Sequence, residues 1–356
     1  YPLGLRFRFL DPSAEAPAEQ LAERVAGAYE DLEYLQQFAT GLDLVTYEFE
    51  NVPVSTAHFL EQRLPVLPPP AALEAAQDRV AEKTFFQKAG LATAPFEAVD
   101  SREDLAGAVE RIGLPAVLKT RRYGYDGKGQ VVLRIQDDIT HAWEKLGGTP
   151  LILEAFVPFE REVSLLAVRG LRGEQAFYPL VENHHRDGML RLSLAPAPGL
   201  TPELQHEAEE LGRRVLEALG YVGVLAVEFF QVPGRRGKGG RDAVSGRLLA
   251  NEMAPRVHNS GHWTIEGAET SQFENHLRAV VGLPLGSTAC LGHSAMVNLI
   301  GTVPDSAAVL AIPHLHLHLY GKSPRPGRKL GHLTLRNDNA KALHEQLERV
   351  RRLVEM

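Results

Sequence analysis

The stretch AVLKTRRYGYDGKGQVVLR, residues 116–134, decides the fold of this chain. Its apolar ends predict two strands, joined by a glycine-rich loop with basic residues on both sides. Glycines let backbone N–H groups approach phosphate oxygens, and Lys119 at the end of the first strand would add a positive charge. The glycine spacing, Lys-Ser/Thr pair and following helix of a P-loop are all absent. We predict a phosphate-binding hairpin, with an ordinary glycine turn as the alternative.

A second apolar stretch, residues 151–154, ends in Glu154, and Glu162 opens the next strand candidate. Such a strand edge can leave an apolar slot for adenine. Backbone groups after Glu154 would read the base, and Glu162 would accept hydrogen bonds from the ribose. The alternative is a solvated charge cluster at a turn.

Two acidic residues interrupt apolar strand patterns further along. Glu228 lies in VLAVEFF, residues 224–230, and Glu252 follows Asn251 in LLANEM, residues 248–253. Buried carboxylates need a cation, and Mg²⁺ is typically held by one or two carboxylates together with nucleotide phosphates. The alternative is a structural pair with Arg or Lys. Strand alternation puts Asn251 and Glu252 on opposite faces, so a β-bulge is needed if both are to reach a metal.

The acidic strand runs into a polar stretch, residues 254–264, APRVHNSGHWT. Arg256 offers a planar fork for bicarbonate or a carboxylated phosphate; the alternative is a hydrogen-bonded corner.

Near the C-terminus, YGKSPRPGRK, residues 320–329, would clamp a substrate phosphate or be a solvated loop. The alternating residues His314, His316 and His318 fit zinc spacing, but half-buried strand histidines are commoner.

Bulk properties exclude several protein classes. At 356 residues the chain exceeds one hydrophobic core, so two or three subdomains are expected. A net charge of −7 opposes non-specific nucleic-acid binding. Cys290 is the only cysteine, which fits a reducing compartment, and no apolar run suggests a membrane span or a signal peptide. We expect a cytoplasmic protein with no nucleic-acid or membrane partner.

The chain organisation predicts a mixed α/β protein. We expect a small domain with a mainly parallel sheet at residues 1–76, from strands at 5–10 and 42–47 and the helical spacing of Leu21, Val25, Leu32 and Leu35. Helices are predicted at 76–89 and 202–219, and strands at 222–232 and 247–253, joined by the basic stretch 234–246, for which we have no role. After about residue 283 we predict strands at 296–300 and 314–320, then a terminal helix.

Four segments carry a resemblance to a known family: TYEFENVP (46–53), GYDGKGQ (124–130), NEMAPRVHNSGHWT (251–264) and PGRKLGH (326–332). Over nearly its whole length the chain resembles the N5-carboxyaminoimidazole ribonucleotide synthetases of the ATP-grasp superfamily. The resemblance implies an α/β and α+β ATP-grasp fold. It divides into a Rossmann-like pre-ATP-grasp domain at 1–76, an ATP-grasp domain at 77–283 with a lid at about 95–157, and a β-rich domain at 284–356.

The resemblance also implies the reaction and its partners. ATP and bicarbonate would form carboxyphosphate, which carboxylates 5-aminoimidazole ribonucleotide in purine biosynthesis, with two Mg²⁺ ions as cofactors and a homodimer as the assembly. Alternatives are an ATP-grasp ligase that uses formate or an amino acid, and a non-catalytic nucleotide-binding protein.

Site residues carry over by position. Arg256, His258 and Lys119 would be catalytic, with Arg256 and His258 holding bicarbonate, and Glu228 and Glu252 would bind the metal. ATP would contact Arg79, Lys119, Gly124, Tyr125, Asp126, Gly127, Lys128, Gly129, Gln130, Glu154, Ala155, Phe156, Val157, Glu162, His185, Asn251 and Glu252. The aminoimidazole ribonucleotide would contact Glu48, Tyr125, Asp126, Lys128, Asn259, Ser260, Lys322 and Arg328, the last two at its phosphate.

One departure from the family concerns the start of the sequence. The family begins with a strand, a glycine-rich turn and a helix, and this sequence joins at the second strand. That turn helps to cradle the ribonucleotide, so we expect an incomplete ribonucleotide pocket in this chain.

Overall fold

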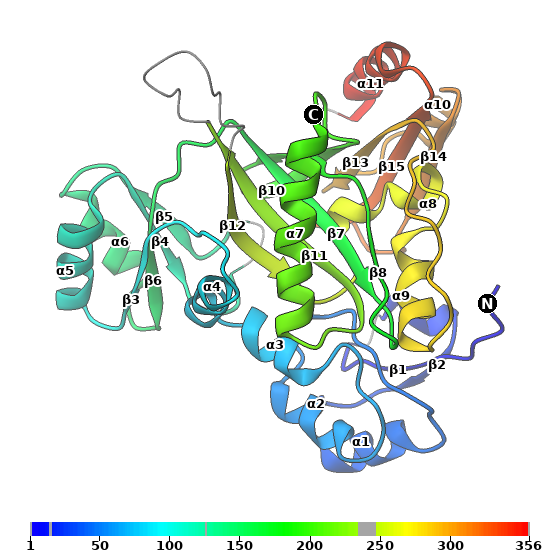
Figure 1. The fold of residues 1–356 in the computed structure, drawn as a ribbon, viewed down its shortest axis with the longest axis horizontal. Helices are drawn as coiled ribbons and strands as arrows, with labels where there is room; N and C mark the ends of the chain where they lie inside the picture. Colours follow the sequence, from blue (N-terminus) through cyan, green and yellow to red (C-terminus); the bar gives the residue numbers. More distant parts are fainter. Residues whose placement is uncertain (1, 14–15, 125–126, 234–246, 355–356) are drawn as a thin grey trace.

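The computed structural model describes residues 2–13, 16–124, 127–233 and 247–354. Their strands form a two-stranded, a four-stranded and a nine-stranded sheet. In Figure 1 the large sheet lies in the middle, the four-stranded sheet on one side of it, and the N-terminal region below. The predicted basic stretch 234–246 lies outside the described residues.

The N-terminal region is a small α/β unit with parallel pairing. Strands β1 (Arg8–Leu10) and β2 (Glu23–Val25) pair in parallel, and Val45 makes an isolated parallel bridge to Val66. They are accompanied by the 3₁₀ turn η1 (Pro17–Gln20) and helices α1 (Leu32–Ala39), α2 (Val54–Glu61) and α3 (Pro70–Ala76). A core that includes Val25, Leu35 and Phe38 joins them.

Two expectations for this region were wrong. Val25 lies in a strand rather than a helix: it pairs with Leu10 in the β1–β2 ladder, and the helix begins only after the cap at Asp31. The predicted strand 42–47 is reduced to the single bridge at Val45.

The four-stranded sheet has the order β3-β6-β4-β5. Its strands are β3 (Phe96–Val99), β4 (Ala116–Thr120), β5 (Gln130–Leu133) and β6 (Leu151–Ala155), and helices α5 (Arg102–Ile112) and α6 (Asp138–Leu146) pack on it. Strands β4 and β5 are an antiparallel pair, which confirms the predicted strand, glycine loop and strand. The helix predicted at 76–89 is shorter: α4 (Arg79–Lys88) begins after the cap Asp78.

The nine-stranded sheet is antiparallel and runs in the order β12-β11-β7-β9-β10-β13-β15-β14, with β8 beside β7. Its strands are β7 (Arg161–Arg169), β8 (Gln175–Phe177), β9 (Val181–Arg186), β10 (Met189–Ala195), β11 (Gly223–Val232), β12 (Arg247–Ala254), β13 (His293–Ile300), β14 (Leu315–Leu319) and β15 (Lys329–Asn337). The β11–β12 pair agrees with the predicted pairing of 222–232 with 247–253.

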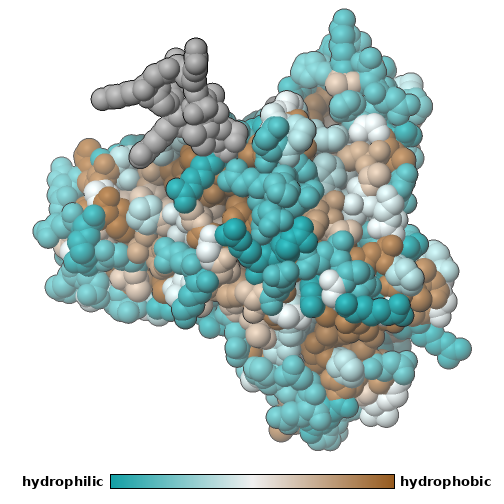
Figure 2. All heavy atoms as spheres, viewed as in Figure 1, coloured by the Kyte–Doolittle hydropathy of each residue, from teal (hydrophilic) through white to brown (hydrophobic). Residues whose placement is uncertain are grey.

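Helices cover both faces of this sheet. Helix α7 (Pro202–Ala218) packs on the face that carries Leu165 and Val227, and its outer side is part of the hydrophilic surface at the centre of Figure 2. The 3₁₀ turn η2 (Asn259–Gly261) and helices α8 (Thr264–Gly267) and α9 (Gln272–Val280) lie against the opposite face, where Leu166 packs with Trp263. This opposite face becomes polar toward the β11–β12 edge.

At the far edge, α10 (Ser306–Leu310) and α11 (Ala340–Val354) pack on β13, β14 and β15. Strands were predicted at 296–300 and 314–320, but β15 was not, because the basic loop before it hides its apolar alternation. None of the described helices is long and apolar enough to cross a membrane.

Candidate active site

A row of polar side chains crosses the large sheet. Glu252 on β12 is directly opposite Glu228 on β11, and Glu228 is directly opposite Ser164 on β7. The register then shifts, so that Phe229 faces Ala250 and Asn251 is an extra residue. This is the bulge that the sequence requires if Asn251 and Glu252 are to reach one site. The Asn251 Oδ1 atom is buried and has no hydrogen-bond partner within the described part of the chain.

The two carboxylates have opposite electrostatic surroundings. Burial and the nearby Glu252 raise the pKa of Glu228, whose side chain is 12% exposed. Burial would also raise the pKa of Glu252, but Arg79, whose Nη1 is 2.9 Å from Glu252 Oε2, holds it below its ordinary value. The Arg79 guanidinium thus neutralises one carboxylate, and the other lacks a full counter-charge.

Glu162 and His185 lie next to Glu228 on the same face. The Glu162 Oε2 and His185 Nδ1 atoms are 2.7 Å apart. Burial alone would lower the pKa of His185, but Glu162 and other nearby acids raise it above its ordinary value. Ligand atoms of Glu162, His185 and Glu228 lie within 4.8 Å of one another, so this trio could also hold a cation. His314, His316 and His318 form no such group among the described residues; the His318 ring instead contacts Glu266.

Lys119 forms an ion pair with Glu154, the acid at the end of the strand predicted at residues 151–154. Its Nζ is 3.0 Å from Glu154 Oε2, on the neighbouring strand β6. A second cation, Lys83 of α4, is 3.2 Å from the same oxygen and was missed by sequence reasoning. Burial would raise the pKa of Glu154, but the two lysines lower it. The available signal was that Lys83 lies one helical turn after Arg79.

The glycine loop packs against the rest of the site. Arg79 donates to the Gly124 carbonyl at 3.4 Å, and the Thr120 N–H donates to that of Gly129. Gly127 has a φ of 73°, and a Cβ there would lie 2.7 Å from the Asp187 carbonyl, so only glycine fits. Gln130 begins β5. Two of the predicted contacts, Tyr125 and Asp126, lie outside the described residues; Lys128 lies inside them.

The segment predicted to contact adenine follows β6, an interior strand of the four-stranded sheet. The N–H groups of Ala155 and Phe156 donate to the carbonyls of Pro95 and Pro115, and the Phe156 ring is exposed. Val157 follows directly and is half-buried. The N–H groups of Ala155 and Phe156 are therefore already paired within the protein, and the contact of this segment with adenine stays a prediction.

Arg256 is held by an acid that sequence reasoning did not single out. Its guanidinium contacts Glu50 through Nη2 at 2.9 Å and Nε at 3.1 Å. Burial raises the pKa of nearby Glu48, against the lowering effect of Arg256 and Lys322. The N-terminal region and the C-terminal basic loop therefore meet beside the β12 end. Within that loop Lys322 lies over the Tyr320 ring, and Arg328 donates to the Ser323 carbonyl.

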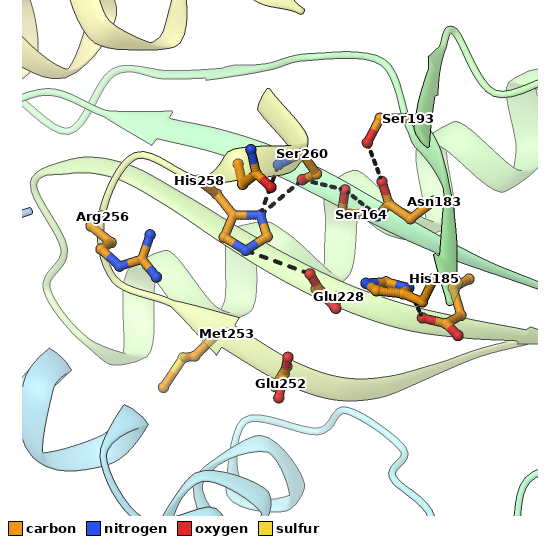
Figure 3. Close-up of polar contacts among 12 residues, drawn as sticks. Ser164, Asn183, His185, Ser193, Glu228, Glu252, Met253, Arg256, His258 and Ser260 are labelled. Carbon is orange, nitrogen blue, oxygen red and sulfur yellow. Dashed lines mark hydrogen bonds and ion pairs between the residues drawn. The ribbon is translucent and has the colours of Figure 1, made fainter. Parts of the chain in front are cut away.

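His258 lies between Arg256 and the acidic row (Figure 3). Its Nε2 is 3.6 Å from Glu228 Oε1, and its Nδ1 is 2.9 Å from Ser260 Oγ. Burial and the neighbouring Arg256 lower the pKa of His258 to about 3, so the ring is neutral. Ser260 is fully buried, and the Asn259 amide exchanges hydrogen bonds with that of Asn298.

Comparisons with known proteins agree with this arrangement. Family models for a ribonucleotide synthetase preATP-grasp domain, an ATP-grasp domain and a phosphoribosylaminoimidazole carboxylase C-terminal domain match residues 1–77, 84–273 and 294–346. The N5-carboxyaminoimidazole ribonucleotide synthase of Pseudomonas aeruginosa is 53% identical over 354 residues, 99% of this chain and 94% of that protein.

Two solved structures of N5-carboxyaminoimidazole ribonucleotide synthases have a similar fold. The N5-carboxyaminoimidazole ribonucleotide synthetase of Thermus thermophilus is 62% identical with a TM-score of 0.93, covering 100% of this chain and 94% of that one. The synthase of Aspergillus clavatus, solved with ADP and 5-aminoimidazole ribonucleotide, is 29% identical with a TM-score of 0.89 over 100% of this chain and 94% of that one.

Proposed function

The chain belongs to the N5-carboxyaminoimidazole ribonucleotide synthases, and we propose that the polar end of its large sheet holds ATP, magnesium and bicarbonate for their reaction. The protein is an ATP-dependent ligase with an ATP-grasp fold that carboxylates 5-aminoimidazole ribonucleotide in purine biosynthesis. The placement of the substrates is our proposal. The observation that carries it is the Glu228–Glu252 pair with the bulge at Asn251.

We place the nucleotide between the four-stranded sheet and the acidic row. Lys119 and the glycine loop would contact its phosphates, with Arg79 behind them. Glu154 to Val157 would contact the adenine, and Glu162 with His185 the ribose. Two ion pairs support this placement: Lys119 with Glu154 in the four-stranded sheet, and His185 with Glu162 in the large sheet. Each fixes a charged side chain on its own side of the proposed nucleotide site.

The residues present fit Mg²⁺. Glu228 and Glu252 repel each other, and the bulge at Asn251 would allow the side-chain oxygen of that residue to serve as a third ligand. Mg²⁺ prefers such oxygen ligands and shares them with nucleotide phosphates. When bound, the metal would stabilise charge on the transferring phosphoryl group.

Bicarbonate would bind at Arg256 and His258. A bicarbonate oxygen attacks the γ-phosphorus of ATP, ADP leaves, and carboxyphosphate forms. The exocyclic amine of the ribonucleotide then forms a bond to the carboxyl carbon, inorganic phosphate leaves, and the amine loses a proton. Arg256 would hold the carboxylate-like end throughout, and closure of the glycine loop would exclude water from the labile anhydride.

The ribonucleotide would lie where the N-terminal region meets the C-terminal loop. Glu48 and the residues of the glycine loop would contact its base, and Lys322 and Arg328 its phosphate. The electrostatic coupling of Glu48 to both Arg256 and Lys322 supports this position. Ser260 is buried and Asn259 is bonded to Asn298, so we place both behind His258, where they support it.

Three broader expectations are also proposals. A division at 1–76, 77–283 and 284–356 is supported by the positions of the family models, and a lid at about 95–157 by the separate four-stranded sheet. A homodimer rests on the family resemblance. A cytoplasmic location rests on the single cysteine.

The test is ADP release by the purified protein, with and without aminoimidazole ribonucleotide, at controlled bicarbonate. We expect release to require both. Release that follows added formate or an amino acid would favour another ATP-grasp ligase, and ATP binding with no dependence on the ribonucleotide or bicarbonate would contradict the proposal.

A further inference from the structure

Four buried polar side chains form a continuous hydrogen-bonded path that ends at His258 (Figure 3). Ser260 Oγ is 2.9 Å from His258 Nδ1, Ser164 Oγ is 2.8 Å from Ser260 Oγ, Asn183 Nδ2 is 3.0 Å from Ser164 Oγ, and Ser193 Oγ is 2.8 Å from Asn183 Oδ1. We call Ser260, Ser164, Asn183 and Ser193 the serine–asparagine chain. All three serines are 0% exposed and Asn183 is 5% exposed, so water does not compete for these groups.

One backbone group fixes the proton at the His258 end. The N–H of Ser260 donates to His258 Nδ1 at 3.3 Å. A backbone amide is only a donor, so Nδ1 must present a lone pair. A neutral imidazole with an unprotonated Nδ1 carries its proton on Nε2, which is the nitrogen that faces Glu228.

The same amide fixes every hydrogen along the path. The Ser260 hydroxyl must donate to Nδ1, because two lone pairs would otherwise face each other. Its oxygen can then only accept from Ser164, whose own oxygen must accept from Asn183. The amide of Asn183 therefore turns its NH₂ to Ser164 and its oxygen to Ser193. This orientation follows from the backbone and does not depend on assigning the amide atoms first.

We propose that the two donors of Ser260, its backbone N–H and its hydroxyl backed by the rest of the serine–asparagine chain, hold His258 as the neutral tautomer with its proton on Nε2, so that this ring donates a hydrogen bond to bound bicarbonate or its phosphorylated form. His258 would accordingly not be the base that removes a proton from the ribonucleotide amine. Ser260 and the three residues behind it are positioning residues, since none of them reaches the site surface. This inference deepens the proposed function, on which the identity of the anion rests.

The surroundings of His258 agree with a neutral donor. The ring lies between the Arg256 guanidinium and Glu228, with its Nε2 3.6 Å from Glu228 Oε1 (Figure 3). The opposite tautomer would turn a lone pair toward Glu228 and toward any anion between His258 and Arg256, which is repulsive. A donor in this position would instead strengthen as charge develops on a carboxylate or phosphate oxygen.

The direct test is the tautomer itself, read by ¹⁵N NMR of the full chain labelled at histidine, without ligands, near neutral pH. The His258 signals are identified by their loss in His258→Asn. We expect an unprotonated Nδ1 and a protonated Nε2. A protonated Nδ1, alone or in an imidazolium ring, would overturn the inference. Because no turnover is measured, this result is independent of whether bicarbonate is the substrate.

A matched pair of variants tests the serine–asparagine chain. Ser260→Ala removes one of the two donors to Nδ1, so we expect some Nδ1–H tautomer and a kcat lower by about tenfold, with the KM for ATP within about twofold. Ser294→Ala is the control: Ser294 on β13 is 1% exposed, and its Oγ has no hydrogen-bond partner among the residues that the structure describes. It should retain both the kcat and the tautomer. Wild-type kcat and a pure Nε2–H tautomer in Ser260→Ala would show that the chain does not act on His258.

Discussion

Glu228 and Glu252 face each other across the β11–β12 pair, and the chain bulges at Asn251 immediately beyond them. Glu252 is paired with the Arg79 guanidinium at 2.9 Å, whereas Glu228 lies 3.6 Å from the His258 ring. The raised pKa of Glu228 follows from its burial and from the neighbouring charge of Glu252. The pair is therefore electrostatically incomplete in the protein alone, as a site for a nucleotide-bound cation would be.

The first prediction concerns Glu252. Glu252→Gln keeps the shape but removes a metal-binding charge, so we expect kcat to fall at least about a hundredfold with little change in the urea midpoint. The control is Glu203→Gln on the exposed first turn of α7. Near-normal turnover in Glu252→Gln would refute the metal role.

The two lysines on Glu154 should separate function from stability. Lys119→Met leaves Glu154 paired with Lys83, so we expect a stable protein whose kcat/KM for ATP is lower by at least about tenfold. Lys83→Met also leaves Glu154 one lysine, but it removes the buried donor to the Asn251 carbonyl, so it should cost about 2 kcal/mol of unfolding free energy. Steady-state kinetics and urea unfolding measure the two effects. Equal effects of both substitutions on ATP use would contradict the assignment.

Lys322 should act on the ribonucleotide alone. Because a lysine contributes a point charge to a phosphate, Lys322→Ala should raise the KM for the ribonucleotide about tenfold and leave that for ATP unchanged. The comparison is Lys341→Ala, which removes an exposed lysine at the start of α11. A rise confined to the KM for ATP would place the phosphate clamp elsewhere.

His276 provides a pH prediction outside the site. Burial lowers its pKa to about 4 from an ordinary 6.5, and its Nδ1 accepts from the Val224 N–H at 3.2 Å. Between pH about 4 and about 6.5, the His276 ring binds a proton more readily in the unfolded chain than in the folded one. Its contribution to the free energy of unfolding is therefore fully present above pH about 6.5 and is lost on acidification, by up to about 3 kcal/mol near pH 4.

His276→Gln should therefore weaken the pH dependence of the urea midpoint between pH about 7 and about 5, whereas His206→Gln, on the exposed side of α7, should not. An identical pH dependence in wild type and His276→Gln would show that His276 does not contribute.

Local patterns predicted the central elements well. The glycine hairpin, α7 and the β11–β12 pair follow from alternation and helical spacing, which tertiary packing here reinforces. The helix expected around Val25 was wrong because residues Glu23–Val25 pair with β1, and strand pairing between separate segments leaves no periodic signal. Strand β15 was missed because a basic loop precedes it.

The site was only partly readable. Carboxylates in apolar strands are conspicuous, so Glu228 and Glu252 could be found, together with the need for a bulge. Partners that come from distant segments could not be found from the sequence. Lys83 of α4 pairs with Glu154, and Glu50 of the N-terminal region pairs with Arg256. Ser164 of β7 is hydrogen-bonded to Ser260. Residues of these types are ordinary in sequence and acquire meaning only through the fold.

The most direct measurement is a crystal structure of the protein with ADP and Mn²⁺ in place of Mg²⁺, in which anomalous scattering locates the metal. We predict an anomalous peak within coordination distance of both Glu228 and Glu252 and of the ADP phosphates. A metal bound by the neighbouring Glu162, His185 and Glu228 trio without Glu252, or away from both acids, would contradict it.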